Sequence, residues 1–410
     1  MTDHDPSKAL QPGSSRAILS PSGQPGGVKE RMTQGALEIA RSYLIVPSKT
    51  PHKVGDYELC DLDYRQICLW AEQFSMTSDG VVKMLTEMTP SENTSWLRED
   101  YDDKYRFMVE DGHIKSLTWF FHETPECEFQ LLDGMLIERL YLHGYEEVDL
   151  FHGREVNPRL PTLKKLVCRS CEINSLNMSA MPLLEDIDCS YNLLFDLDLK
   201  SVSKLQRFDC SENKFTELNL APVPHLRRLT CDRNQLTELA LASVPNLVNL
   251  CCYHNKLTEL DLGPVRELRW LFCWGNQLAE LGLASVPNLR ELYCSDNQIT
   301  SLDLSAVSQL TTLGCGGNQL TELDLSGVPQ LTKLGCWGNQ LTELGLSAVP
   351  NLRELYCSDN QLTELDLTPV PDLWEVNCRG NLLTELDIRP LKNLKTLKVD
   401  DHVRIIGTRP

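Results

Sequence analysis

The sequence predicts an α/β solenoid: a curved array of repeats with a parallel β-sheet on its concave face, preceded by a small helical region. Two observations support this fold class. The stretch ELYCSDNQ occurs at 291–298 and again at 354–361. Cysteines recur every 21 residues from Cys168 to Cys378, and an asparagine follows each by three residues except in the first repeat, where Cys171 takes that place. Repeats this short cannot bury an apolar face alone, so they are stable only when stacked.

Each repeat has the form L-x-x-L-x-C-x-x-N-x-L-T-x-L-x-L, followed by a short Val-Pro linker. In LRELYC at 352–357, strand alternation places Leu355 and Cys357 inside and Glu354 and Tyr356 outside. The asparagine can satisfy backbone groups where the chain leaves the strand, and the cysteine acts as a small buried hydrophobe. One sulfur per coil offers a metal no second type of ligand, so we expect packing, with no metal site and no cofactor.

This unit is the signature of the leucine-rich repeat, and the resemblance covers residues 137–404. The cysteine form of the repeat resembles the internalins of Gram-positive bacterial surfaces, in particular those with a cysteine ladder. It is also similar to the repeat arrays of bacterial effector proteins that enter host cells. The resemblance implies a curved solenoid used for binding, and it leaves the ligand open.

Composition excludes several classes of partner. The chain has 39 basic and 58 acidic residues, a net charge of −19, which argues against nucleic acid and anionic membranes. No apolar run approaches the roughly 18 residues needed to span a bilayer, and the N-terminus has no apolar segment typical of a cleaved signal. Stacked free thiols fit a reducing compartment, whereas the internalin resemblance implies export. We therefore expect a protein that is cytoplasmic, or secreted without a cleaved signal peptide.

The chain divides into four stretches. Residues 1–32, rich in Ser, Pro, Gly and Gln, are predicted to be disordered. Residues 33–104 are predicted to be helical, with helices at 35–46, 63–74 and 78–88, the last two capped by Asp63 and Ser78. Residues 105–157 are predicted to form a capping hairpin, with its turn at Asp111-Gly112, and two degenerate repeats. Residues 158–404 form the solenoid, and Lys395 and Lys398 mark its polar C-terminal cap.

The outward positions of the repeats are free to carry function. The early coils are charged with mixed sign, and aromatic residues then cluster on three adjacent coils and recur further along. Aromatic residues with a charged rim predict a protein-binding surface. The predicted ligand-binding residues are Tyr253, Trp270, Phe272, Trp274, Tyr293, Trp337 and Tyr356. Two alternatives stay open: the rings stack across strands and only stiffen the sheet, or they stack on sugars.

The opposite flank carries a stripe of acidic residues, which is most simply a solvated face but could attract cations or basic partners. Its members are Glu217, Glu238, Glu259, Glu280, Glu322, Glu343, Glu364 and Glu385, with Asp261, Asp303, Asp324, Asp366 and Asp387.

Catalysis has little support in the sequence. No Cys-His, Ser-His-Asp or HExxH arrangement is recognisable, and Cys60 or Cys68 could be a nucleophile but has no identifiable partner base. We expect no enzyme and no catalytic residues, but a monomer that binds a protein partner on its concave face. Three hypotheses remain: an exported bacterial virulence effector, a cytoplasmic scaffold or sensor, and a lectin-like carbohydrate binder.

Overall fold

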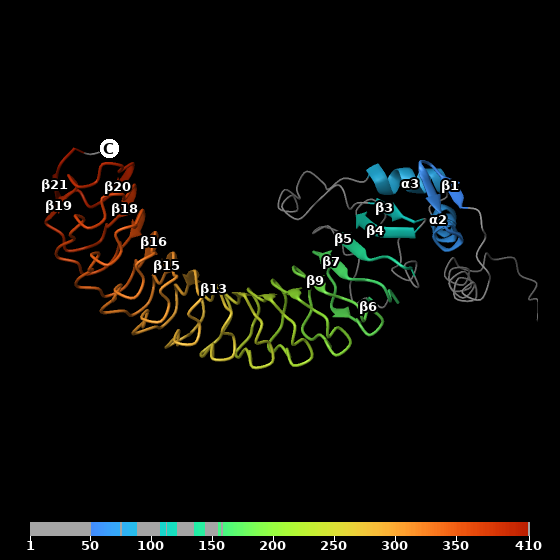
Figure 1. Cartoon of the computed structure of the whole chain (residues 1–410), viewed down its shortest axis with the longest axis horizontal. Coiled ribbons are helices and arrows are strands. Elements are labelled where there is room, and N and C mark those ends of the chain that lie inside the picture. The colour runs from blue at the N-terminus through green and yellow to red at the C-terminus, as the bar shows by residue number, and fades with distance from the viewer. Residues whose placement is uncertain are drawn as a thin grey trace, which may run out of the picture.

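The computed structural model describes residues 51–73, 76–87, 107–111, 113–120, 135–143, 155–156 and 159–408. These residues form an arc, with a small unit containing the helices at one end and the C-terminus at the other (Figure 1). The stretch 1–32 and the helix predicted at 35–46 lie outside the described residues.

One 15-stranded sheet lines the inner curve of the arc (Figure 1). Its strands are parallel except for β3, which pairs antiparallel with β4 at one edge. In chain order they are β3 (Phe107–Glu110), β4 (His113–Phe120), β5 (Arg139–His143), β7 (Lys165–Arg169), β9 (Asp186–Asp188), β10 (Arg207–Asp209), β11 (Arg228–Thr230), β12 (Asn249–Cys251), β13 (Trp270–Phe272), β14 (Glu291–Tyr293), β15 (Thr312–Gly314), β16 (Lys333–Gly335), β17 (Glu354–Tyr356), β18 (Glu375–Asn377) and β20 (Thr396–Lys398).

The remaining strands of the described residues form three short two-stranded sheets. They are β1 (His52–Val54) with β2 (Tyr57–Leu59), β6 (Glu155–Val156) with β8 (Ser175–Leu176), and β19 (Glu385–Asp387) with β21 (Arg404–Ile406).

The core is the stack of leucines and cysteines that the repeat predicts. The register places Leu271 between Leu250 and Leu292, and each of the three is 0% exposed. Leu355 and Cys357 are also fully buried, whereas Glu354 and Tyr356 lie half-buried on the opposite side of the strand, which confirms the predicted inside and outside. Since a buried leucine contributes about 1.5–3 kcal/mol, the stacked leucines hold neighbouring coils together.

The asparagines form a second ladder that ties each coil to the one before it. The amide nitrogen of Asn297 donates to the carbonyls of Cys273, Cys294 and Ser295, each at 3.1 Å. Its Oδ1 accepts the N–H of Leu278 at 3.0 Å. In the first repeat the thiol of Cys171 fills this place and donates to the Arg169 carbonyl at 3.1 Å.

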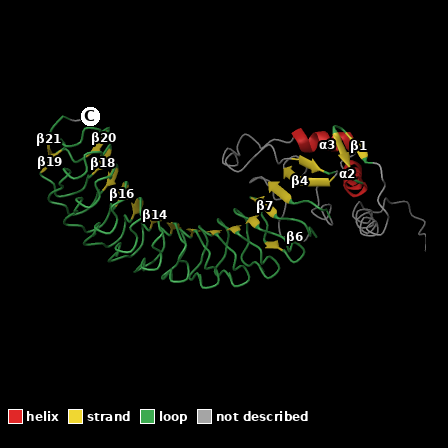
Figure 2. Cartoon of the chain, in the orientation of Figure 1, coloured by secondary structure: helices red, strands yellow, loops and turns green. Residues whose placement is uncertain are grey.

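Turns, rather than helices, connect the coils on the convex side. Figure 2 shows mainly loops on this side of the array, with short strands such as β6, β19 and β21, and the described helices, α2 (Asp61–Gln73) and α3 (Ser78–Glu87), both precede it. In one such turn the N–H of Val286 donates to the Leu283 carbonyl at 3.1 Å. A repeat of 21 residues leaves little chain for a helix, and Pro287 lacks the N–H that a helix would use. The predicted fold class is confirmed, and among the described residues the helices lie only in the N-terminal unit.

The two helices begin differently from the prediction. Asp63, predicted as an N-cap, lies in the first turn of α2, and the N–H of Tyr64 donates to the Cys60 carbonyl at 2.9 Å. The Asp63 carboxylate instead contacts His113 and the N–H of Ile114 in the β3–β4 hairpin. The cap of α3 is Thr77 rather than Ser78, because the Thr77 hydroxyl accepts the N–H of Gly80 at 3.0 Å. The hairpin β1–β2 was not predicted.

The hairpin and the last coil close the two ends of the array. Strands β3 and β4 flank Asp111, whose φ of 52° provides the predicted turn. At the other end, Lys395 lies 5.7 Å from the centroid of the Trp374 ring, and Arg404 pairs with Glu385. These charged side chains give the last coil the polar surface expected of a solenoid end.

All sixteen thiols should be free in denatured, non-reduced protein. Neighbouring ladder cysteines are within disulfide range, but their parallel side chains do not point at one another. Burial raises the pKa of these thiols, that of Cys294 to about 12, so a thiol reagent should not reach them in the native state. In a Cys127→Ser background without added metal, we expect Cys60 and Cys68 to react before denaturation, whereas the partly exposed Cys251, whose pKa burial raises to about 12, should react far more slowly. Several ladder disulfides would contradict this prediction.

Candidate functional site

The concave face presents outward side chains in rows, because the register places each residue beside its counterpart 21 positions away. One row contains Cys251, Phe272, Tyr293 and Gly314, and the next contains Asn249, Trp270 and Glu291. The structure therefore brings together the five predicted residues Tyr253, Trp270, Phe272, Trp274 and Tyr293, here called the aromatic patch. The patch lies on β13 and β14 and on the residues just after β12 and β13, and all five side chains are half-buried.

Four rings of the aromatic patch stack in two pairs. The rings of Tyr253 and Trp274 are 4.6 Å apart at an interplanar angle of 8°, and those of Phe272 and Tyr293 are 5.2 Å apart at 10°. The His254 ring packs against Trp274 edge-on, 4.1 Å away. The stacking alternative is thus present in the structure, and it fixes the rings without removing them from solvent. Rings held in this way lose little freedom on binding, so stacking and binding are compatible.

Trp337 lies apart from the patch, beside the glycines at 316 and 335. A Cβ at Gly316 would approach the Trp337 ring to 2.4 Å, so the ring lies directly against the backbone there. Trp337 nevertheless stays 38% exposed. At Gly335, by contrast, the nearest heavy atom to a Cβ would be 3.9 Å away. Glycine at 316 therefore allows Trp337 to lie flat and present its outer face.

Tyr356 lies on the coil after that of Trp337, beside Gly335, and belongs to a charged group. Its hydroxyl donates to Glu354 at 3.1 Å, and the Lys333 ammonium lies 5.6 Å from its ring centroid and 2.8 Å from Glu354. Burial and the Glu354 charge raise the pKa of Tyr356. The ring is thus fixed, like those of the aromatic patch.

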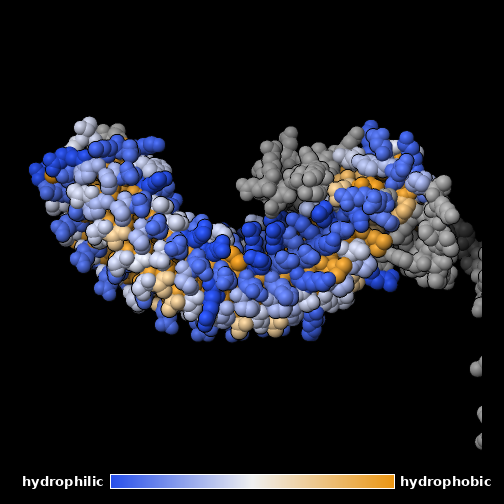
Figure 3. Space-filling view, viewed as in Figure 1, coloured by the Kyte–Doolittle hydropathy of each residue, from blue (hydrophilic) through white to orange (hydrophobic). Residues whose placement is uncertain are grey.

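Charged side chains of β7–β11 border the aromatic patch. Arg169 pairs with Asp188, Lys165 and Arg207 both approach Asp186, and hydrophilic residues cover most of the visible face (Figure 3). Asp209 lies beside Asp188 in the sheet, and burial and the Asp188 charge raise its pKa to about 7.

The charged coils contact the aromatic patch at Asp232. This carboxylate is 3% exposed and is hydrogen-bonded to the Tyr253 side chain. Burial raises its pKa to about 6, against the effect of the Tyr253 bond. The buried carboxylate and the stacked ring therefore support each other, a connection that the sequence analysis missed.

Asp209→Asn should stabilise the protein at neutral and higher pH. The folded chain holds the Asp209 proton up to about pH 7, whereas the unfolded chain releases it near pH 4, so stability from this group is lost as pH rises between these values. Because water screens a half-buried carboxylate, we expect a gain of about 1–2 kcal/mol at about pH 8 and almost none near pH 4. Denaturation at both pH values measures it. The exposed Asp401→Asn is the control, and equal effects of both changes would contradict the assignment.

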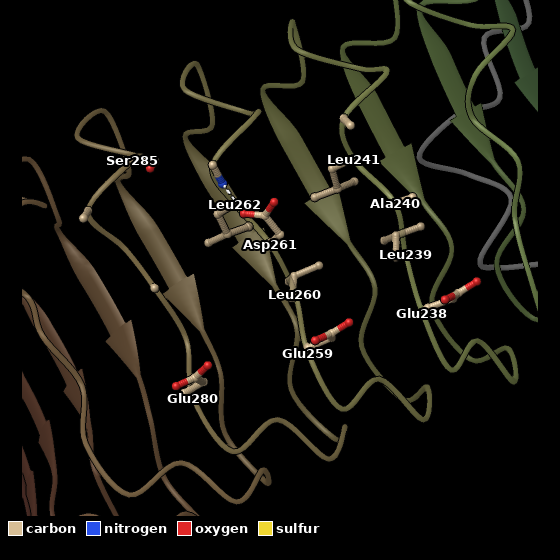
Figure 4. A pocket seen from close by; sticks show the side chains of 14 residues that line it. Glu238, Leu239, Ala240, Leu241, Glu259, Leu260, Asp261, Leu262, Glu280 and Ser285 are labelled. Atoms are coloured by element: carbon tan, nitrogen blue, oxygen red, sulfur yellow. Dashed lines mark hydrogen bonds between the residues drawn. The ribbon is translucent and has the colours of Figure 1, made fainter.

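On the outer flank the acidic stripe follows successive coils, as predicted. Glu238, Glu259 and Glu280 lie in line at the rim of a hollow of about 560 Å³ whose floor includes Leu260 and Leu262 (Figure 4). The aspartates of the stripe accept backbone N–H groups two residues on, as Asp261 does from Gly263 at 2.8 Å. Asp303 accepts such bonds from Ser305, and they lower the pKa of the Asp303 carboxyl. The aspartates thus shape turns.

A cluster that was not predicted lies in the N-terminal unit, where Cys60 meets Asp63 and His113. His113 is 50 residues from Asp63, and no motif joins them. The fold therefore places His113 within hydrogen-bond distance of Cys60, a contact that could not be identified in the sequence.

The comparisons with known proteins agree with this architecture. A family model described as leucine-rich repeats (2 copies) matches residues 266–306, 287–327 and 329–371. The functional domain of InlJ from Listeria monocytogenes, described as including a cysteine ladder, is 28% identical, with a TM-score of 0.57. The match covers 68% of this chain and 65% of that one, so the chain spans just under two-thirds of the length of that InlJ domain.

Two further structures share the fold. YopM from Yersinia enterocolitica is 28% identical over 73% of this chain and 65% of that chain, with a TM-score of 0.54. A leucine-rich-repeat protein of Leptospira interrogans is 22% identical over 72% of this chain and 78% of that chain, with a TM-score of 0.60, which supports the fold alone. No curated protein sequence matches the chain.

Fold and comparisons together define a leucine-rich-repeat protein. More particularly, the chain is a leucine-rich-repeat solenoid with a cysteine ladder, similar to the internalins. This fold is consistent with protein–protein interaction. None of the helices in the described residues is long and apolar enough to cross a membrane.

Proposed function

We propose that this chain is a bacterial interaction protein that binds a protein partner on its concave face as a monomer. The observation that carries the proposal is the aromatic patch, with four of its rings fixed by stacking and all five half-exposed. It lies between the charged strands β7–β11 and the exposed Trp337. A central aromatic anchor with a charged rim is the composition of a protein-binding hot spot.

The surface fits a protein better than the other ligands considered. Stacked rings offer a broad apolar area at low entropic cost, and the mixed charges of β7–β11 can pair with both signs on a protein surface. A net charge of −19 disfavours nucleic acid. A carbohydrate ligand, considered from the sequence, has no support in the comparisons.

Site-specific photo-crosslinking tests the location of binding. The probe is a peptide selected on the whole chain from a phage-displayed random library, so that no partner need be known in advance. A photoreactive phenylalanine at Trp337 should crosslink to the peptide, whereas the same residue at Glu343 on the outer flank should not. Crosslinking from Glu343 alone would place the site on the outer flank.

We further propose that the chain is exported without a cleaved signal. The similarity to proteins of Listeria and Yersinia supports a bacterial origin. Residues 1–32 fused to a reporter enzyme should direct it into the medium, whereas the reporter alone should stay in the cell. Retention of the fusion in the cell would favour the cytoplasmic scaffold or sensor.

A further inference from the structure

Three side chains of different chemistry meet in the N-terminal unit, far from the aromatic patch. Cys60 directly precedes α2, Asp63 lies in its first turn, and His113 opens β4. The Cys60 Sγ is 3.1 Å from Asp63 Oδ2 and 3.2 Å from His113 Nδ1, and Nδ1 is 3.0 Å from Oδ2. The three atoms therefore form a nearly equilateral triangle. Figure 1 shows α2 beside β3 and β4, which bring them together.

This triangle does not fit a nucleophile with a proton relay. In a Cys-His-Asp relay the histidine uses one ring nitrogen for the nucleophile and the other for the carboxylate. Here both the thiol and the carboxylate lie against the same nitrogen, Nδ1, which can hold only one proton. Three donor atoms around one point suit a bound ion better than a chain of proton transfers.

A second observation points the same way. Asp63 is 1% exposed, and its Oδ1 has no hydrogen-bond partner among the described residues. The other oxygen accepts the Ile114 N–H at 3.3 Å as well as the contacts from Cys60 and His113. A buried carboxylate oxygen left without a partner is costly, and a cation in contact with the group would compensate it.

We propose that Cys60, Asp63 and His113 form a Zn²⁺ site. A tetrahedral zinc ion with bonds of about 2.3 Å to sulfur and about 2.0–2.1 Å to nitrogen and oxygen places its ligands about 3.3–3.6 Å apart. The observed separations of 3.0–3.2 Å need only a slight opening of the triangle. Thiolate, imidazole and carboxylate together favour zinc over Mg²⁺ or Ca²⁺.

The site leaves a fourth position for water or for a ligand from outside the chain. The His113 side chain is 35% exposed, so the triangle faces solvent on one side. The ligands of this site come from the start of α2 and the start of β4, so the ion would join α2 to the strand next to the edge of the long sheet. No metal was expected from the repeats, and residues 50 positions apart show no ligand spacing that could have indicated this site.

The test uses the full chain, freed of metal with a chelator and titrated with Zn²⁺ against a chromophoric competitor. We expect one equivalent bound per chain, loss of Cys60 reactivity toward thiol reagents, and a thiolate-to-metal absorption band when Co²⁺ replaces Zn²⁺. Mg²⁺ should give no response. Absence of the one bound equivalent, or of the thiolate band, would overturn the proposal.

Variants separate this site from the other thiols. Cys60→Ser and His113→Gln should each weaken Zn²⁺ binding by more than the roughly 10–100-fold typical of outer-shell changes. Cys68→Ser is the matched control: this half-buried thiol on α2 contacts Ser78 at 3.6 Å and lies outside the triangle. Since Asp63→Asn alters a buried residue, the partly exposed His113 keeps the test decisive if that variant fails to fold. Unchanged affinity in Cys60→Ser and His113→Gln would refute the site.

Discussion

Replacing Asn297 with alanine is expected to lower the free energy of unfolding by about 2–3 kcal/mol. The reason lies in how the asparagine ladder shares its bonds. In the variant, the Cys273 carbonyl still accepts a hydrogen bond from the Asn276 amide, and the Cys294 carbonyl still accepts one from the Asn318 amide. The N–H of Leu278, however, is left buried without its acceptor. A single orphaned donor and a small cavity therefore set the cost.

Urea denaturation of Asn297→Ala beside Gln298→Ala measures this effect. Gln298 is exposed, so its truncation should be nearly neutral. Asn297→Asp is a sharper variant, because an aspartate keeps the acceptor for Leu278 but turns an oxygen toward the two cysteine carbonyls. It should be destabilising at neutral pH and recover as acid protonates the carboxylate. Equal losses in Asn297→Ala and Gln298→Ala would mean that the ladder does not hold the coils.

The array could be predicted because one short period fixes everything about it. Because the cysteine at 294 is followed by another at 315, each repeat position is buried or exposed as in the repeat before it. The same period fixes the register between neighbouring strands. The burial of Leu355 and Cys357 and the grouping of the aromatic patch on three adjacent coils follow from this arithmetic alone.

The N-terminal unit could not be predicted in the same way, because no period relates its parts. The meeting of Cys60 and His113 depends on how a hairpin packs against a helix, which is set by tertiary contacts. The caps show the same limit. Asp63 and Ser78 are good N-cap residues by type, but the fold uses Asp63 to contact the hairpin and caps α3 with Thr77.

Backbone strain is a further feature that the repeat conceals. The residue two positions after each cysteine has a left-handed φ, for example 51° at Glu212 and 54° at Asp296. Gly317 and Gly338 occupy this position in other coils, at 61° and 62°. Because glycine adopts this conformation without penalty, its recurrence at a single repeat position was the available signal.

The double change Trp270→Ala plus Trp274→Ala is expected to weaken partner binding by about 2–4 kcal/mol, roughly 30- to 1,000-fold. It removes the indole stacked on Tyr253 and a neighbouring ring of the aromatic patch. Both side chains are only half-buried, whereas Leu271 and Cys273 between them carry the packing of the strand. The loss should therefore fall on binding rather than on folding.

Titration of the selected peptide against wild type and double variant, with circular dichroism to check folding, measures this loss. The matched control is Glu322→Ala plus Glu343→Ala, which changes two exposed side chains of the outer flank and should alter affinity far less. Since peptide binding needs apolar area that excludes water at its centre, loss of two central rings should outweigh loss of two solvated charges. Unchanged affinity in the double Trp variant would place the binding site outside the aromatic patch, with the N-terminal unit as the next surface to examine.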